Sequence, residues 1–120
     1  MPASEFRKHG HDVIDWIADY LESPEQWPVL PDVRPGELRS ALPKSPPARA
    51  EPMAAILDDF RNLIVPATTH WNHPSFLAYF ANSSTAAGVL GETLAAALNV
   101  NAMLWRTAPA ATELELLTLD

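Results

Sequence analysis

The sequence predicts a mainly α-helical chain, and three observations support this. Apolar residues recur at spacings of three and four in the segments 3–21 and 53–64, as on one face of a helix. An alanine-rich stretch and a leucine-rich stretch follow, at 84–98 and from Pro109 onward. The intervening segment 23–52 is irregular, because it holds eight of the 12 prolines.

The first helix is expected to begin at about residue 2 or 3 and to end near residue 21, before Pro24. Gly10 lies on its apolar side and costs about 1 kcal/mol of helix propensity. A close contact with another helix would explain a glycine at that position. The apolar stripe is formed by Phe6, Val13, Ile17 and either Tyr20 or Leu21.

The proline-rich connector 23–52 has two interpretations. Its composition is typical of a linker. It is equally consistent with an ordered arm that wraps a partner surface, because proline lowers the entropy cost of an extended path. One short helical turn is expected at 36–42.

The second amphipathic helix follows Pro52, which is harmless in a first turn, and is expected to stop at Pro66. A third helix, capped by Ser83 or Ser84, should run to about Leu98. Its alanines and glycines would let another backbone approach closely, so we expect it to be buried against something large.

The last predicted helix begins near Pro109 and continues to Asp120 without a glycine, asparagine or basic stop signal. The outward-facing apolar stripes do not add up to a self-contained core. We therefore expect the N-terminal part of a larger subunit, or an intertwined oligomer.

Composition excludes several functions. The net charge of −7 argues against nucleic-acid binding, and the lack of cysteine excludes disulfides and thiolate metal sites. No signal peptide is recognisable, and no run of about 20 apolar residues could span a membrane. We expect a soluble, cytoplasmic protein.

The segment THWNHPSFLAYFANSS, residues 69–84, is the first candidate site. A metal site at His70 and His73 is disfavoured, because H-x-x-H is not the i, i+4 spacing of two ligands on one helical face. Serine hydrolase chemistry is disfavoured as well, because no G-x-S-x-G turn is present. Two interpretations stay open: a packed strand or turn, and the wall of a ligand pocket. A second mixed cluster, whose alternative is ordinary packing, contains Asn101, Met103 and Trp105.

Four segments together resemble the N-terminus of the aromatic L-amino-acid decarboxylases, which are group II pyridoxal-phosphate-dependent decarboxylases. They are ASEFRKHGHDVIDWIADYLE, WPVLPDVRPGELRSALP, HWNHPSFLAYFANSS and MLWRTAPAATELE. The resemblance covers essentially the whole chain. It implies an obligate homodimer with the α/β fold of aspartate aminotransferase (fold type I). It also implies pyridoxal 5′-phosphate (PLP) held by a lysine of the large domain, and loss of the substrate carboxylate as CO₂.

The resemblance also implies roles for single residues. Trp71, Tyr79, Phe80 and Asn82 match the segment that lines the substrate cleft, and Asn101 and Met103 match positions that reach into the neighbouring subunit's cleft. Animal members usually carry proline and threonine in place of Ala81 and Asn82, and isoleucine and phenylalanine in place of Asn101 and Met103. The pocket would therefore be more polar, which leaves tryptophan, tyrosine, phenylalanine, dopa or a non-aromatic amino acid open as substrate.

The expected organisation is a helical dimerisation arm at 1–65 and, at 66–120, the cleft segment and the beginning of the PLP-binding domain. Neither Lys8 nor Lys44 resembles the cofactor lysine, so no catalytic or cofactor-binding residue is expected here, and the chain alone should be inactive. The alternatives are a non-catalytic helical interaction module and an aromatic aldehyde synthase of the same family.

Overall fold

Every regular element that the structure describes is a helix or a helical turn. This computed structural model describes residues 1–80 and 82–120, and Ala81, one of the expected departures from the family, lies outside them. The chain divides into two units, Met1–Ser83 and Ser84–Asp120. The prediction of a mainly α chain is confirmed for the described residues, whereas the α/β fold expected for a whole subunit stays a prediction.

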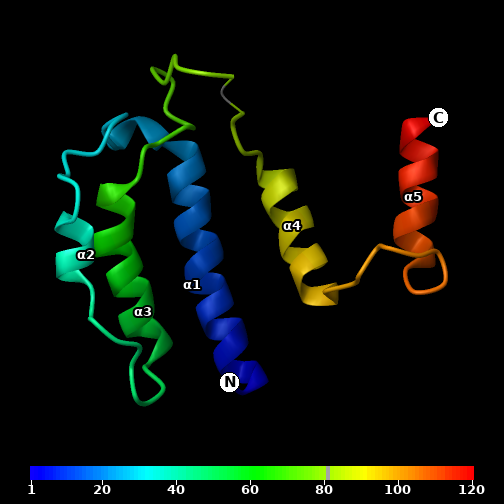
Figure 1. The fold of residues 1–120 in the computed structure, drawn as a ribbon, viewed down its shortest axis with the longest axis horizontal. Coiled ribbons are helices and arrows are strands. Elements are labelled where there is room, and N and C mark those ends of the chain that lie inside the picture. The colour runs from blue at the N-terminus through cyan, green and yellow to red at the C-terminus, as the bar shows by residue number, and fades with distance from the viewer. Residues whose placement is uncertain (81) are drawn as a thin grey trace. The chain divides into compact units, whose positions relative to one another are not determined.

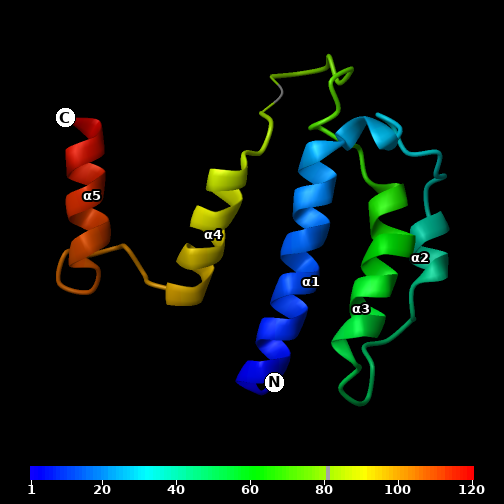
Figure 2. The ribbon, with the colours of Figure 1, turned by 180° about the vertical axis from the view of Figure 1, so that it is seen from behind.

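The first unit is built around α1 (Ala3–Glu22), which matches the predicted first helix. In both ribbon views α3 (Met53–Asp59) runs beside α1 (Figures 1 and 2). Directly after α3, the ring of Phe60 packs edge to face with Trp16 of α1, with the ring centroids 4.9 Å apart. The expected close contact at Gly10 is wrong within this chain, because no atom lies within 4 Å of the place that a Cβ would occupy.

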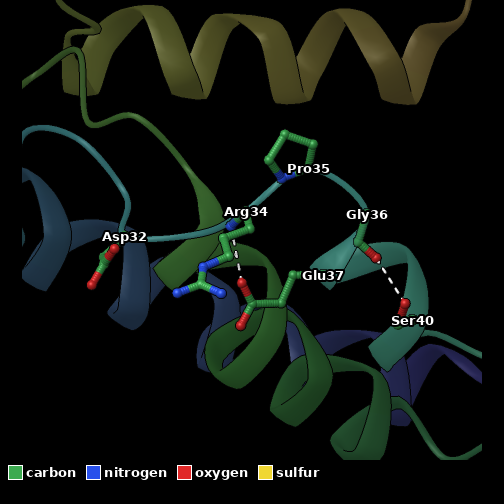
Figure 3. Close-up of a pocket in the computed structure, with 6 residues that line it drawn as sticks. All are labelled: Asp32, Arg34, Pro35, Gly36, Glu37 and Ser40. Atoms are coloured by element: carbon green, nitrogen blue, oxygen red, sulfur yellow. Dashed lines mark hydrogen bonds between the residues drawn. The ribbon is translucent and has the colours of Figure 1, made fainter.

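The connector carries two short turns, the 3₁₀ turn η1 (Pro24–Gln26) and α2 (Glu37–Ala41). Before α2 the chain makes a turn that requires glycine, since Gly36 has a φ of 89°. The backbone N–H of Arg34 donates to the Glu37 carboxylate at 2.9 Å (Figure 3). The hollow in that view, about 530 Å³, is lined by exposed residues of the connector itself.

The second predicted helix has an irregular end. α3 passes into the π-helical turn η2 (Phe60–Ile64) and then into the 3₁₀ turn η3 (Val65–Ala67), which contains Pro66. Pro66 has no amide hydrogen and its ring clashes with the preceding turn, so the α-helical ladder cannot continue through it. The predicted stop is confirmed, but the π turn was not predicted.

The second unit contains α4 (Ala86–Leu98) and α5 (Pro109–Leu119), close to the predicted bounds. The N-cap of α4 is Thr85 rather than Ser83 or Ser84, because the Thr85 hydroxyl accepts the Gly88 N–H at 3.1 Å. Asn99 ends α4 in the left-handed conformation, with a φ of 46°. Nearly all of α4 is exposed in this chain, so its expected burial stays a prediction.

Apolar surface is left uncovered in both units. Only Val65, Phe76 and Ala108 are buried hydrophobic residues among those described. The accessible area is 10198 Å², against roughly 7,600 Å² for two separate compact units of these lengths. No helix among the described residues is long and apolar enough to cross a membrane. The helices therefore present faces that other polypeptide would have to cover.

Candidate functional site

The candidate segment leaves η3 as a series of turns rather than a strand. The N–H of His73 donates to the His70 carbonyl at 3.0 Å, and the N–H of Phe76 donates to the His73 carbonyl at 2.9 Å. Of its apolar residues Phe76 is buried, whereas Tyr79 and Phe80 are 85% and 97% exposed. Packing within this chain accounts for Phe76 alone, and the pocket-wall role of Tyr79 and Phe80 stays a prediction.

Three rings of this segment form one stack. Trp71 lies against Phe76 at a centroid distance of 4.8 Å and nearly parallel to Tyr79 at 5.9 Å, with 8° between their planes. Tyr79 has a φ of 58°, a left-handed conformation that costs a bulky residue about 1–2 kcal/mol. We call Trp71, Phe76 and Tyr79 the aromatic wall. Such strain is characteristic of segments shaped for binding.

Phe80 and Asn82 follow the wall and are also exposed. Phe80, at 97%, has almost no cover. The structure thus presents the four predicted residues of this segment on a surface, and it joins two of them, Trp71 and Tyr79, by direct ring contact. Phe76 belongs with them but was not predicted as a site residue.

The second predicted cluster lies in the loop between α4 and α5. The Asn101 side-chain oxygen accepts the Met103 N–H at 3.0 Å, which closes a local turn and leaves Met103 74% exposed. The indole N–H of Trp105 donates to Glu113 of α5 at 3.0 Å. Asn101 therefore shapes the loop. Because this loop belongs to the other unit, its approach to any cleft stays a prediction.

A buried histidine holds the start of the wall. His70 is 2% exposed. The Nδ1 atom of its ring lies 3.0 Å from the Tyr20 hydroxyl of α1, and the ring stacks on Trp27 at a centroid distance of 5.6 Å. Its backbone N–H donates to the Val29 carbonyl at 3.1 Å. Burial lowers the pKa of His70, and the nearby backbone of Val65 opposes this effect. Burial also raises the pKa of Tyr20, so that its hydroxyl stays protonated.

This network was missed by the sequence reasoning, which weighed His70 only as a metal ligand or a structural histidine. Tyr20 was visible solely as a member of the apolar stripe. Its hydroxyl meets a ring that lies 50 positions away in the sequence, and no local signal marks such a pair.

The lowered pKa of His70 predicts a loss of stability in mild acid. Near neutral pH the imidazole is uncharged in both the folded and the unfolded chain. As the pH falls below about 6.5 the unfolded chain takes up a proton that the buried ring resists, so the free energy of unfolding falls. We expect the thermal midpoint of the full-length subunit to decrease between about pH 7 and pH 5.5. The decrease should be smaller in His70→Gln, and equal pH slopes for the two proteins would contradict the prediction.

The described residues contain no group of three His, Cys, Asp or Glu side chains arranged to hold a metal. His73 Nδ1 accepts the Ser75 N–H at 2.9 Å, and His9 pairs with Asp12 at 3.3 Å. Lys8 and Lys44 are both exposed, one on α1 and one in the connector. Neither fits the buried lysine that would hold PLP, and no step through the cofactor is assigned to this chain.

Comparison with known proteins gives one consistent result. The family described as the pyridoxal-dependent decarboxylase conserved domain matches residues 35–120. Phenylacetaldehyde synthase of Arabidopsis thaliana is 47% identical over 120 residues, and tryptophan decarboxylase 2 of Oryza sativa subsp. japonica is 44% identical over 120; in both, all of this chain aligns with 24% of the relative. The crystal structure of Oryza sativa TDC with PLP and tryptamine superposes with a TM-score of 0.93 at 40% identity, covering 100% of this chain and 25% of that one. The chain thus spans about a quarter of the length of these relatives.

Proposed function

Since the chain belongs to the pyridoxal-dependent decarboxylase family, we propose that it is the N-terminal part of a PLP-dependent decarboxylase of aromatic L-amino acids. In the proposal it contributes dimer contacts and part of the substrate cleft. The observation that carries it is the aromatic wall: the rings of Trp71 and Tyr79, the latter in a strained backbone conformation, stay open to solvent and stack beside the buried Phe76.

The wall would bind the side chain of the substrate. Aromatic pairs contribute about 0.5–1.5 kcal/mol beyond the area that they bury, and they prefer offset or edge-to-face arrangements. Trp71 is 44% exposed although both neighbours contact it, so part of its ring is available to a ligand. Bound PLP supplies the electron sink for the bond that breaks. Because no described lysine fits it, we assign its binding to the part of the protein outside this chain.

A homodimer is part of the same proposal. α1 exposes Phe6 and Ile14, and α4 exposes Leu94 and Leu98. A second copy and the remainder of the subunit would cover these faces, as in the obligate dimers that the family resemblance implies. A cytoplasmic location stays a prediction from the sequence.

An aldehyde synthase is the second candidate, because relatives of that name match as well as the decarboxylases do. Phenylacetaldehyde synthase of a Rosa hybrid cultivar is 50% identical over 116 residues, covering 97% of this chain and 23% of the relative. Assaying the full-length protein for amine against aldehyde distinguishes the two. A third candidate, a non-catalytic interaction module, predicts that the coding sequence beyond Asp120 contains no cofactor lysine.

The pocket assignment is tested by substrate preference. We expect Asn82→Thr and Met103→Phe in the full-length protein, each introducing the residue usual in animal members of the family, to shift the ratio of kcat/KM among tryptophan, tyrosine, phenylalanine and dopa by about tenfold, the scale of one altered pocket contact. Asn62→Thr, an exposed asparagine of η2, is the matched control and should leave the ratio unchanged. If neither site variant alters preference, the segment serves packing alone.

A further inference from the structure

The aromatic wall begins directly after a buried residue of the first unit. His70 precedes Trp71 directly and is buried, whereas Trp71 is 44% exposed. Two separate parts of the first unit hold His70: α1 through the Tyr20 hydroxyl, and the segment after η1 through the Trp27 ring and the Val29 carbonyl. The backbone from which Trp71 leaves is therefore set by groups that lie 40 to 50 positions earlier in the chain.

The contacts of His70 are directional as well as apolar. A hydrogen bond of 3.0 Å to Nδ1 and a backbone hydrogen bond of 3.1 Å fix the ring and the main chain of the same residue. Tyr20 is in turn stacked on Trp16 at 5.3 Å with 9° between the rings, so the hydroxyl has a defined direction. From His70 the main chain turns through His73 to Phe76, the buried ring of the wall.

We propose that Tyr20 and His70 are positioning residues for substrate binding: the hydrogen bond between them fixes the position of the aromatic wall relative to α1. The proposal rests on the proposed function, since it assumes that the wall binds the substrate side chain. Neither residue touches substrate. Their effect is transmitted through the main chain of residues 70 and 71 and through the turns that follow.

Protonation of His70 acts on the same bond. Among the described residues, the ionisable groups that face it are Tyr20 from α1 and His73 from its own segment, while Trp27 and the Val65 backbone carry no charge. Within residues 1–80 and 82–120 no carboxylate contributes to the pKa of the ring, and His73 disfavours a second positive charge. Burial keeps the pKa of His70 below its usual value, so the wall is held by a neutral ring at neutral pH and is loosened in acid.

The test uses the full-length enzyme and Tyr20→Phe, which removes the hydroxyl and retains the ring on Trp16. We expect KM for the preferred aromatic amino acid to rise about three- to tenfold at about pH 8 while kcat stays within about twofold, the scale of one buried hydrogen bond. Leu57→Ala is the control. Leu57 lies on α3 and lines the same small cavity as Val13 and Ile17 of α1, so its truncation weakens the packing of α1 and lowers the thermal midpoint. It leaves Tyr20, its stack on Trp16 and its bond to His70 in place, so KM should remain that of the parent.

A second measurement follows pH. In the parent enzyme KM should rise as the pH falls from about 7 to about 5.5, and this rise should be smaller in His70→Gln, whose side chain does not titrate. If Tyr20→Phe lowers the thermal midpoint without changing KM, or if Leu57→Ala raises KM equally, the two residues are merely structural and the inference fails. If the parent converts no aromatic amino acid at all, the proposed function itself fails. These two failures are distinct.

Discussion

The 120-residue chain by itself should release no detectable amine or aldehyde from any aromatic amino acid, even with PLP added. Its two lysines are exposed on unrelated elements, and nothing beside them would desolvate an amine and lower its pKa for Schiff-base chemistry. The measurement is product formation by chromatography, with the full-length protein at equal concentration as the positive control. Product from the short chain that requires added PLP would contradict the assignment of the cofactor to the rest of the subunit.

Substrate binding by the short chain should also be too weak to detect. Ligand pockets usually bury 70–90% of a small ligand. Here Tyr79 and Phe80 are almost entirely open to solvent. A ring placed on such a surface would keep much of its own area in water. In the proposal, other cleft residues and a second subunit would close this open surface.

The elements that proline and periodicity define were predictable. α1 begins just after Pro2, α5 begins at Pro109, and the second amphipathic helix stops around Pro66. Proline acts locally, because it fixes φ and removes a donor at one position. The choice of Thr85 over two adjacent serines as N-cap was not predictable, since all three side chains can accept the same hydrogen bond.

Side-chain partners across the fold were less predictable than the elements. Trp71 and Tyr79 were assigned by resemblance, and their stacking depends on a positive φ at Tyr79, which no tyrosine signals in advance. The pairing of Tyr20 with His70 depends on how α1 packs beside the segment after η3. Long-range pairs follow from the tertiary arrangement, and a single sequence carries no direct record of them.

Trp71→Ala in the full-length protein should reduce kcat/KM for aromatic amino acids by about 10- to 100-fold, through a higher KM, because removing an aromatic contact from a binding site costs about 1.4–2.8 kcal/mol. Trp71 is the middle ring of the wall, so its removal separates Phe76 from Tyr79. Tyr79 then loses the stack that helps to hold its left-handed backbone, and it can relax away from the binding position.

Trp71→Phe is the matched variant, because it retains a ring between the two neighbours while giving up the larger indole face. Its loss in kcat/KM should be well below that of Trp71→Ala, and kinetics with tryptophan, tyrosine and phenylalanine would show whether the loss is greatest for the largest side chain. The thermal midpoint should change little in either variant, since Trp71 is 44% exposed and lies outside the buried contacts of His70. A Trp71→Ala enzyme with an unchanged KM would show that the substrate ring binds elsewhere, and the stacked rings would then be a packing feature of the turn.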